Sequence, residues 1–234
     1  MPPVCFVNVI SPAELVARVD AALWNPAATV ADIQAFCADA REHRFRAVCV
    51  NGSRVELAYA RLEDSGVQVV ALIGFPLGAM DTDAKRYEAE VAVDHGAHEI
   101  EVVLNPGWLK DSAHRQVLRE LRDVVEAADE RPVCAVIETT HLTREEISAA
   151  CHLILESGAK AVATATEFWP DTHAAQADVK LLRESLALDF VVKAAGGIRD
   201  AQTARALLDA GATRIGTTDP GSLWQSLQAH NGLF

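Results

Sequence analysis

The stretch ESGAKAVATATEF, residues 156–168, holds the pattern that decides the fold. A polar segment ends at Gly158, and an apolar run of small and β-branched residues follows at once. Glycine ends helices because it adopts the left-handed backbone conformation without steric cost. The same phrase recurs as DHGAHEI at 94–100 and as DAGATRI at 209–215. Each copy predicts the end of a helix, a glycine cap and the start of a strand.

Apolar runs alternate with segments of helical period along the whole chain. We predict strands at 17–24, 46–51, 67–74, 98–104, 132–138, 159–165, 189–194 and 213–217. We predict helices at 30–43, 81–95, 110–128, 143–157, 174–186 and 200–210. Thr143 and Glu146 have the spacing of a capping box at the start of the fourth of these helices.

Apolar strands that alternate with helices indicate a parallel sheet covered on its faces. Eight such units within 234 residues favour an α/β fold of the (β/α)₈ or TIM-barrel type. No G-x-G-x-x-G follows the first strand, which weakens the alternative of a Rossmann sheet. No linker or low-complexity region divides the chain. We therefore predict one barrel domain over residues 1–234, with a short N-terminal helix.

Net charge, cysteine spacing and apolar runs indicate which partners and which compartment to expect. The formal net charge of −12 argues against nucleic acid or an anionic membrane as the main partner. The five cysteines form no C-x-x-C pair, which favours a reduced compartment over a disulfide framework. The N-terminus lacks the pattern of a signal peptide, and no apolar run is long enough to suggest a membrane span. We expect a cytoplasmic protein.

Catalytic side chains of such barrels lie at the C-terminal ends of the strands. The strand ends of this chain carry Glu101, Glu138, His141 and Lys193, which are our catalytic candidates. Further polar or small residues at the same ends are candidates for substrate binding. They are Cys49, Asn51, Asn105, Thr164, Thr166, Glu167, Gly196, Gly197, Arg199, Thr218 and Asp219.

Several stretches together resemble the deoxyribose-phosphate aldolase family, in the order and spacing of that family and over nearly the whole chain. They are VDAALWNPAAT (19–29), AVCVN (47–51), LIGFPLGA (72–79), HEIEVVLNPGWLK (98–110), AVIETTHLT (135–143), GAKAVATATEF (158–168), VKAAGGIRDA (192–201) and RIGT (214–217). The pair LIGFPLGA and VKAAGGIR is the most specific part. The resemblance implies a class I aldolase barrel that acts on a small carbonyl compound without a cofactor, and a homodimer is compatible with it.

In the family, a lysine on the sixth strand forms a Schiff base, a second lysine on the seventh lowers its pKa, and an aspartate on the fourth helps to move protons. The position of the Schiff-base lysine holds Ala163 here, and a methyl group cannot form an iminium. The second lysine is retained as Lys193, and the aspartate is replaced by Glu101. A family lysine on the fifth strand is matched by Cys134, and a threonine near the end of the first strand by Ala22.

The family's phosphate site is also altered. The turn of Gly196, Gly197 and Arg199 remains, but Glu167 replaces a glycine, and Thr218 and Asp219 replace a pair of serines. Each carboxylate within ~5 Å of a phosphate dianion would cost on the order of a few kcal/mol at an effective dielectric constant of about 20. We therefore expect weak binding of phosphorylated sugars. Glu167 and Asp219 either pair with Arg199 and close the pocket, or receive a different substrate.

The residues leave several roles open. Lys193 is a proton donor or oxyanion partner, an amine nucleophile, or the cation of a structural ion pair with Glu101 or Glu167. Glu101 is predicted to point into the barrel as a general base or acid. For Glu138 we favour a structural role over catalysis. For His141 we favour a solvated position in a loop, without a catalytic role. We expect no metal, because the acidic residues and His141 match no metal-binding motif.

Three functions follow from these alternatives. The first is an aldolase-like enzyme that has lost Schiff-base cleavage and uses Glu101 and Lys193 for proton transfer on a non-phosphorylated carbonyl compound. Its reaction would be C–C bond making or breaking, or a related enolisation or cyclisation. The second is retained deoxyribose-phosphate aldolase activity through Lys193. The third is a non-catalytic relative that binds a ligand or partner at the barrel mouth.

Overall fold

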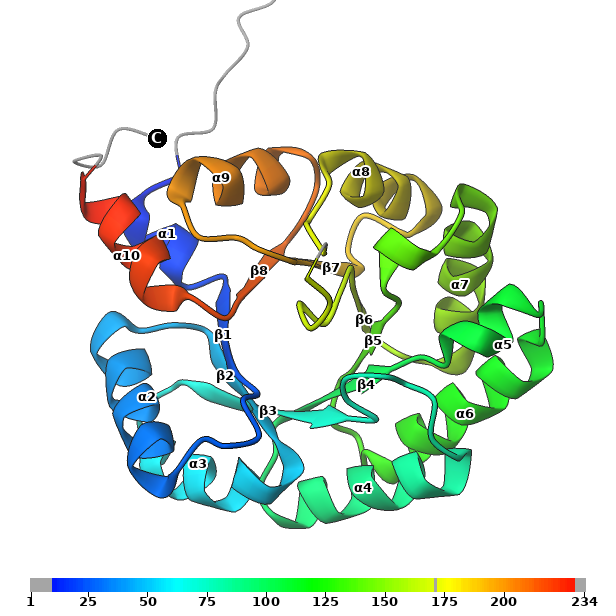
Figure 1. The fold of residues 1–234 in the computed structure, drawn as a ribbon, viewed down its shortest axis with the longest axis horizontal. Coiled ribbons are helices and arrows are strands. Elements are labelled where there is room, and N and C mark those ends of the chain that lie inside the picture. Colours follow the sequence, from blue (N-terminus) through cyan, green and yellow to red (C-terminus); the bar gives the residue numbers. More distant parts are fainter. Residues whose placement is uncertain (1–9, 171, 230–234) are drawn as a thin grey trace, which may run out of the picture.

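The computed structural model describes residues 10–170 and 172–229, which form a closed barrel of parallel strands in the order β1 to β8. Helices surround the strands on the outside, so that the view along the barrel shows a ring of strands within a ring of helices (Figure 1). The strands are β1 Val19–Leu23, β2 Ala47–Asn51, β3 Gln68–Ile73, β4 Glu99–Val103, β5 Val133–Val136, β6 Ala161–Ala163, β7 Val191–Ala195 and β8 Arg214–Thr217. The predicted TIM barrel is confirmed.

Alternation along each strand divides the side chains between two environments. One set faces outward and packs under the helices in the main apolar core, which includes Ile100, Val102 and Ala135. The other set fills the barrel interior in two small clusters, one around Val136 and Ala163 and one around Cys49. Every second residue of a strand therefore points into the barrel interior, and only these residues can contribute to a site there.

The predicted capping box is present at helix α7, Arg144–Ser157. Thr143 accepts from the N–H of Glu146, the Glu146 carboxylate accepts from the N–H of Thr143, and Gly158 ends the helix at φ +91°. The other helices are α1 Pro12–Val16, α2 Val30–His43, α3 Val55–Leu62, α4 Thr82–Asp94, α5 Pro106–Lys110, α6 His114–Ala127, α8 Gln176–Ser185, α9 Ala201–Asp209 and α10 Pro220–Ala229, with 3₁₀ turns at Gly52–Arg54 and Thr139–His141. The short N-terminal helix is confirmed as α1.

The prediction of one helix over 110–128 was wrong. Asn105 caps α5 by accepting from the N–H of Trp108, and α5 ends at Lys110. Ser112 then adopts φ +53°, which interrupts the helical backbone before α6 begins at His114. The sequence reading also missed α3 and α10, which begin within a few residues of the ends of β2 and β8. None of the helices among the described residues combines the length and apolar character needed to cross a membrane.

Candidate functional site

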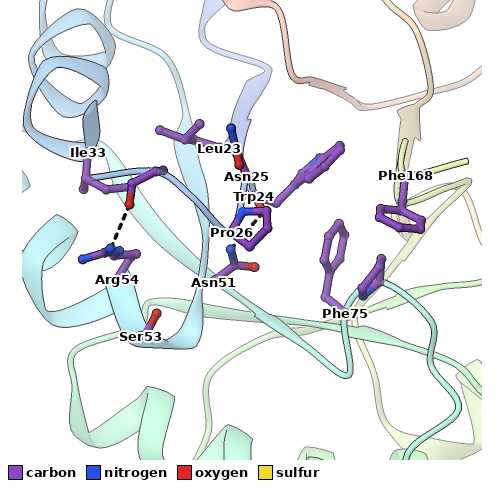
Figure 2. Close-up of a pocket in the computed structure, with 12 residues that line it drawn as sticks. Leu23, Trp24, Asn25, Pro26, Ile33, Asn51, Ser53, Arg54, Phe75 and Phe168 are labelled. Carbon is purple, nitrogen blue, oxygen red and sulfur yellow. Dashed lines mark hydrogen bonds between the residues drawn. The ribbon is translucent and has the colours of Figure 1, made fainter. Parts of the chain in front are cut away.

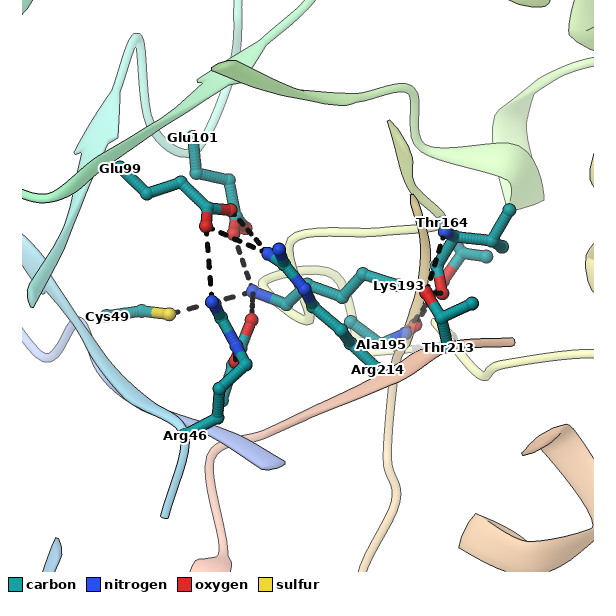
Figure 3. A network of polar contacts seen from close by, with 11 residues as sticks. Arg46, Cys49, Glu99, Glu101, Thr164, Lys193, Ala195, Thr213 and Arg214 are labelled. Atoms are coloured by element: carbon teal, nitrogen blue, oxygen red, sulfur yellow. Dashed lines mark hydrogen bonds and ion pairs between the residues drawn. The ribbon is translucent and has the colours of Figure 1, made fainter. Parts of the chain in front are cut away.

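The side chain of Lys193 lies at the centre of the barrel interior, nearly fully buried. Its Nζ donates to Glu101 Oε2 at 2.5 Å and lies 3.4 Å from Asp20 Oδ2 and 3.6 Å from Cys49 Sγ (Figure 3). Glu101 points into the barrel, as predicted from alternation on β4. Ala163 pairs with Lys193 in the β6–β7 register and adds only a methyl group to this interior.

Below this pair the interior holds a chain of ion pairs. The Arg214 guanidinium binds both oxygens of Glu99 at 2.7 and 2.9 Å, and Arg46 Nη1 reaches Glu99 Oε2 at 3.3 Å. Arg46 also pairs through Nε with Asp20, which in turn faces Lys193. Counting Lys193 and Glu101, three cations face three carboxylates. Such alternation satisfies charges that would each be costly to bury alone.

This arrangement sets the protonation of the central pair. Burial by itself would lower the pKa of Lys193, but the neighbouring carboxylates raise it well above its usual range. Burial raises the pKa of Glu101, and Lys193 only partly opposes that effect. Burial also raises the pKa of the Cys49 thiol, which keeps it neutral. At neutral pH the site therefore offers an ammonium donor beside a carboxylate that is more basic than usual.

Glu167 lies where the resemblance places a phosphate site. Its Oε1 accepts from the N–H of Gly197 at 3.0 Å, and its Oε2 accepts from the N–H of Thr218 at 3.1 Å. Backbone N–H groups of this kind are the donors that hold anions at loop and helix termini. The carboxylate of Glu167 therefore occupies them. Asp219 Oδ2 lies 3.9 Å from Arg199 Nε, so that only Asp219 of the two acids pairs with that guanidinium.

The remaining catalytic candidates lie at the rim. Glu138 has φ +53°, and its Oε1 accepts a short hydrogen bond from the N–H of Thr166, which joins the ends of β5 and β6. Burial raises the pKa of this carboxyl group. His141 packs edge-on against Trp169 with ring centroids 5.4 Å apart, and it is half-buried. These contacts are structural, and the structure does not bring Glu138 or His141 into contact with Lys193.

The substrate-binding candidates divide into three groups. Thr164 donates to the carbonyl of Ala195 at 2.7 Å and accepts from the Ala195 N–H at 2.9 Å, which ties β6 to β7. Asn105 caps α5, and Asn51 donates to the carbonyl of Trp24 at 3.0 Å. The third group lies at the barrel mouth or around the loops that hold Glu167, and it consists of Cys49, Thr166, Glu167, Gly196, Gly197, Arg199, Thr218 and Asp219.

Aromatic rings border the barrel mouth above Lys193. Trp24 lies 5.8 Å from Phe75 and 5.9 Å from Phe168 between ring centroids. The loop after β6, which carries Phe168, curls inward over the barrel centre (yellow in Figure 1). The cavity that Lys193 and Glu101 line has a volume of about 20 Å³, enough for about one water molecule. A substrate would therefore have to displace part of this aromatic rim.

Sequence reasoning assigned no catalytic or binding role to Asp20, and it missed Arg46, Glu99 and Arg214. The alternation of side chains along a strand could have identified Glu99 from the sequence. Glu99 stands two residues before Glu101 on β4 and so shares its face. Among residues 10–170 and 172–229, no three His, Cys, Asp or Glu side chains gather as a metal site would require.

The closed eight-stranded barrel with a buried lysine–carboxylate pair in its interior has the architecture of an aldolase-type TIM barrel. The profile of the DeoC/LacD family aldolases matches residues 15–218, and the chain belongs to this family. It is 42% identical to the deoxyribose-phosphate aldolase of Bdellovibrio bacteriovorus, over 92% of this chain and 97% of that protein. It is 40% identical to the enzyme of the same name from Carboxydothermus hydrogenoformans, over 93% and 97%.

Solved structures agree with the family assignment. The chain is similar to QR15, an aldolase, with a TM-score of 0.88 and 33% identity over 93% of this chain and 97% of the other. It is also similar to the tetrameric deoxyribose phosphate aldolase of Aeropyrum pernix, with a TM-score of 0.86 and 27% identity over 94% and 93%. The family resemblance inferred from the sequence motifs is confirmed.

Proposed function

We propose that this chain is an aldolase-family enzyme that acts on a non-phosphorylated carbonyl compound by acid–base chemistry. The observation that carries the proposal is the buried pair of Lys193 Nζ and Glu101 Oε2 at 2.5 Å. Glu101 takes a proton from the carbon next to the carbonyl group. Lys193 donates a hydrogen bond to the carbonyl oxygen, where negative charge develops. The resulting enolate is the common intermediate of aldol reactions and enolisation.

The environment of Lys193 supports a proton donor more than an amine nucleophile. A nucleophilic amine must lose its proton, and the carboxylates of Glu101 and Asp20 oppose that loss. Ala163, at the position matched to the family's Schiff-base lysine, provides no nucleophile. Glu167 supports a substrate without a phosphate, because its carboxylate already accepts from the backbone donors of Gly197 and Thr218.

The test is exchange of α-protons in D₂O, followed by proton NMR over a panel of non-phosphorylated aldehydes and ketones. We expect exchange of at least one compound, and we expect Glu101→Gln to reduce its rate by about 10²- to 10⁴-fold. Glu126→Gln is the matched control, because Glu126 is an exposed residue on α6, and it should leave the rate unchanged. An unchanged rate in Glu101→Gln would refute the assigned base.

Deoxyribose-phosphate aldolase activity through Lys193 is the second candidate, which the names of the relatives favour. Borohydride treatment in the presence of acetaldehyde or deoxyribose 5-phosphate, read by mass spectrometry, separates the two. A reduced adduct on Lys193 would establish the iminium route and overturn our proposal. Absence of both adduct and exchange would leave the non-catalytic, ligand-binding relative.

A further inference from the structure

A second cavity of about 340 Å³ lies beside the barrel mouth, over the loops that follow β1, β2 and β3. Its size falls within the range of about 300–1,000 Å³ that small-molecule sites occupy. Trp24 and Phe75 line both this cavity and the small one above Lys193, so that the two are neighbours. We call the larger one the side pocket. Its lining residues are shown in Figure 2.

Most of the wall of the side pocket is apolar. Trp24, Phe75 and Phe168 gather on one side with their rings close together, and Leu23 and Ile33 lie on the other (Figure 2). An apolar or aromatic group that enters this space removes its own surface and that of the rings from water, which stabilises the complex at roughly 25 cal/mol per Å². This wall would contribute little to binding a polyhydroxylated sugar phosphate.

A cationic group stands at the other end of the side pocket. Arg54 Nη2 donates to the carbonyl of Ala28 at 2.8 Å, which fixes the guanidinium against the loop after β1 (Figure 2). Within the part of the chain that the structure describes, no carboxylate lies within 4.0 Å of Arg54. In a chain of net charge −12, such an unpaired guanidinium is a ready partner for a ligand carboxylate.

Two further polar groups complete the pocket. The amide of Asn51 donates to the carbonyl of Trp24 at 3.0 Å, which fixes this side chain in the wall of the pocket. The hydroxyl of Ser53 is exposed on the same loop as Arg54. A ligand with one carboxylate and one apolar body therefore finds a matching group for each part.

We propose that the side pocket binds the apolar or aromatic, carboxylate-bearing end of the substrate. The carbonyl end would then extend past Trp24 and Phe75 toward Lys193. The second statement rests on the proposed function, whereas binding in the side pocket does not. The substrate class is accordingly an oxo acid with an apolar or aryl body.

Binding is tested by isothermal titration calorimetry with 4-phenylbutanoate, its neutral amide and butanoate. We expect saturable binding of 4-phenylbutanoate and at least tenfold weaker binding of both the amide, which lacks the charge, and butanoate, which lacks the ring. Equal affinities of the acid and the amide, or no saturation by the acid, would overturn the proposal. All three titrations use the wild-type chain, so that folding of a variant is not at issue.

Two variants assign the binding to the side pocket. Arg54→Met should weaken binding of 4-phenylbutanoate at least tenfold and abolish the preference for the acid, and Trp24→Leu should weaken the acid and the amide alike. Arg18→Met is the matched control, because Arg18 is exposed and precedes β1 at the opposite end of the barrel. Unchanged affinity in Arg54→Met would show that the acid binds elsewhere.

A last comparison separates this proposal from the proposed function. Binding in Glu101→Gln should equal that of the wild type, since the side pocket does not contain Glu101. If no carbonyl compound shows α-proton exchange while 4-phenylbutanoate still binds with the expected preferences, the catalytic proposal is refuted and the side-pocket proposal is supported. If α-proton exchange is observed but 4-phenylbutanoate does not bind, the side-pocket proposal is refuted and the catalytic proposal is retained.

Discussion

At the scale of the residue, the proposal of a substrate without a phosphate rests on Glu167. It adopts φ +64°, a left-handed conformation that costs an ordinary residue of order 1–3 kcal/mol and suits glycine. Its carboxylate gains two backbone hydrogen bonds in that conformation, to Gly197 and Thr218. Burial raises the pKa of Glu167 in spite of these bonds. The Glu167 carboxylate thus takes up the two backbone N–H groups that we propose would otherwise bind an anion.

Replacement of Glu167 by glycine should create an anion site. The left-handed conformation is retained without strain, and the N–H groups of Gly197 and Thr218 are released. We expect Glu167→Gly to bind inorganic phosphate at least tenfold more tightly than the wild type, measured by isothermal titration calorimetry. Glu167→Gln is the control, because it keeps the side chain in place and should show no gain. Equal phosphate affinity in all three proteins would contradict this role.

Asp20 makes a second prediction at this scale. Burial would raise its pKa, but Lys193, Arg46 and Arg214 hold it below the usual value. A lowered native pKa adds stability above the unfolded pKa of about 3.9, and this stability is lost as the pH falls through the native pKa. We expect Asp20→Asn to lower the free energy of unfolding at pH 7 by about 3–5 kcal/mol, because two cations lose a carboxylate partner.

Urea denaturation of the wild type and Asp20→Asn at several pH values checks the sign. The difference between the two proteins should shrink as the pH falls below about 4, where Asp20 of the unfolded wild-type chain begins to gain a proton while the native carboxylate is still ionised. Asp111→Asn, at an exposed position after α5, should show no such trend. A difference between wild type and Asp20→Asn that stays constant from pH 7 to pH 3 would rule out this contribution.

At the scale of the element, the strands were predictable, whereas helices α3, α5 and α10 were not. A buried parallel strand has a local signature, namely an apolar run after a glycine cap, as in ESGAKAV before β6. The break between α5 and α6 depends on the capping side chain of Asn105 and on positive φ at Ser112, and neither interrupts the hydrophobic period. The ends of strands gave the positions of Glu101 and Lys193, whereas the partners of the ion-pair chain appear only when the barrel closes.

The capping box of α7 is the element whose contribution can be measured most directly. Thr143 and Glu146 bond reciprocally across the first turn of the helix. We expect Thr143→Ala to lower the free energy of unfolding by about 0.5–2 kcal/mol. Glu145→Ala, at the exposed position next to Glu146, should change it by less than about 0.5 kcal/mol. Equal effects of the two substitutions, measured by urea denaturation, would show that the cap does not stabilise the helix.

At the scale of the whole molecule, the ion-pair chain crosses the barrel interior. Asp20 lies on β1, Glu99 and Glu101 on β4, Lys193 on β7 and Arg214 on β8, and Arg46 immediately precedes β2. Strands that are not neighbours in the sheet, such as β4 and β7, are therefore connected by side-chain ion pairs inside the barrel. Lys193 and Glu101, the proposed acid and base, both belong to this ion-pair chain, so we expect substitutions of either residue to change stability as well as activity.

A double-mutant cycle on the central pair separates these two roles. Lys193→Met leaves Glu101 and Asp20 without their shared cation, and we expect it to lower the free energy of unfolding by about 3–5 kcal/mol. Glu101→Gln leaves Lys193 with Asp20 and should cost less. The double variant should be more stable than the sum of the single effects predicts, with a coupling of about 0.5–3 kcal/mol. Additive effects would show that the pair does not stabilise the fold, and the carboxylate beside Lys193 would then have to be explained by catalysis alone.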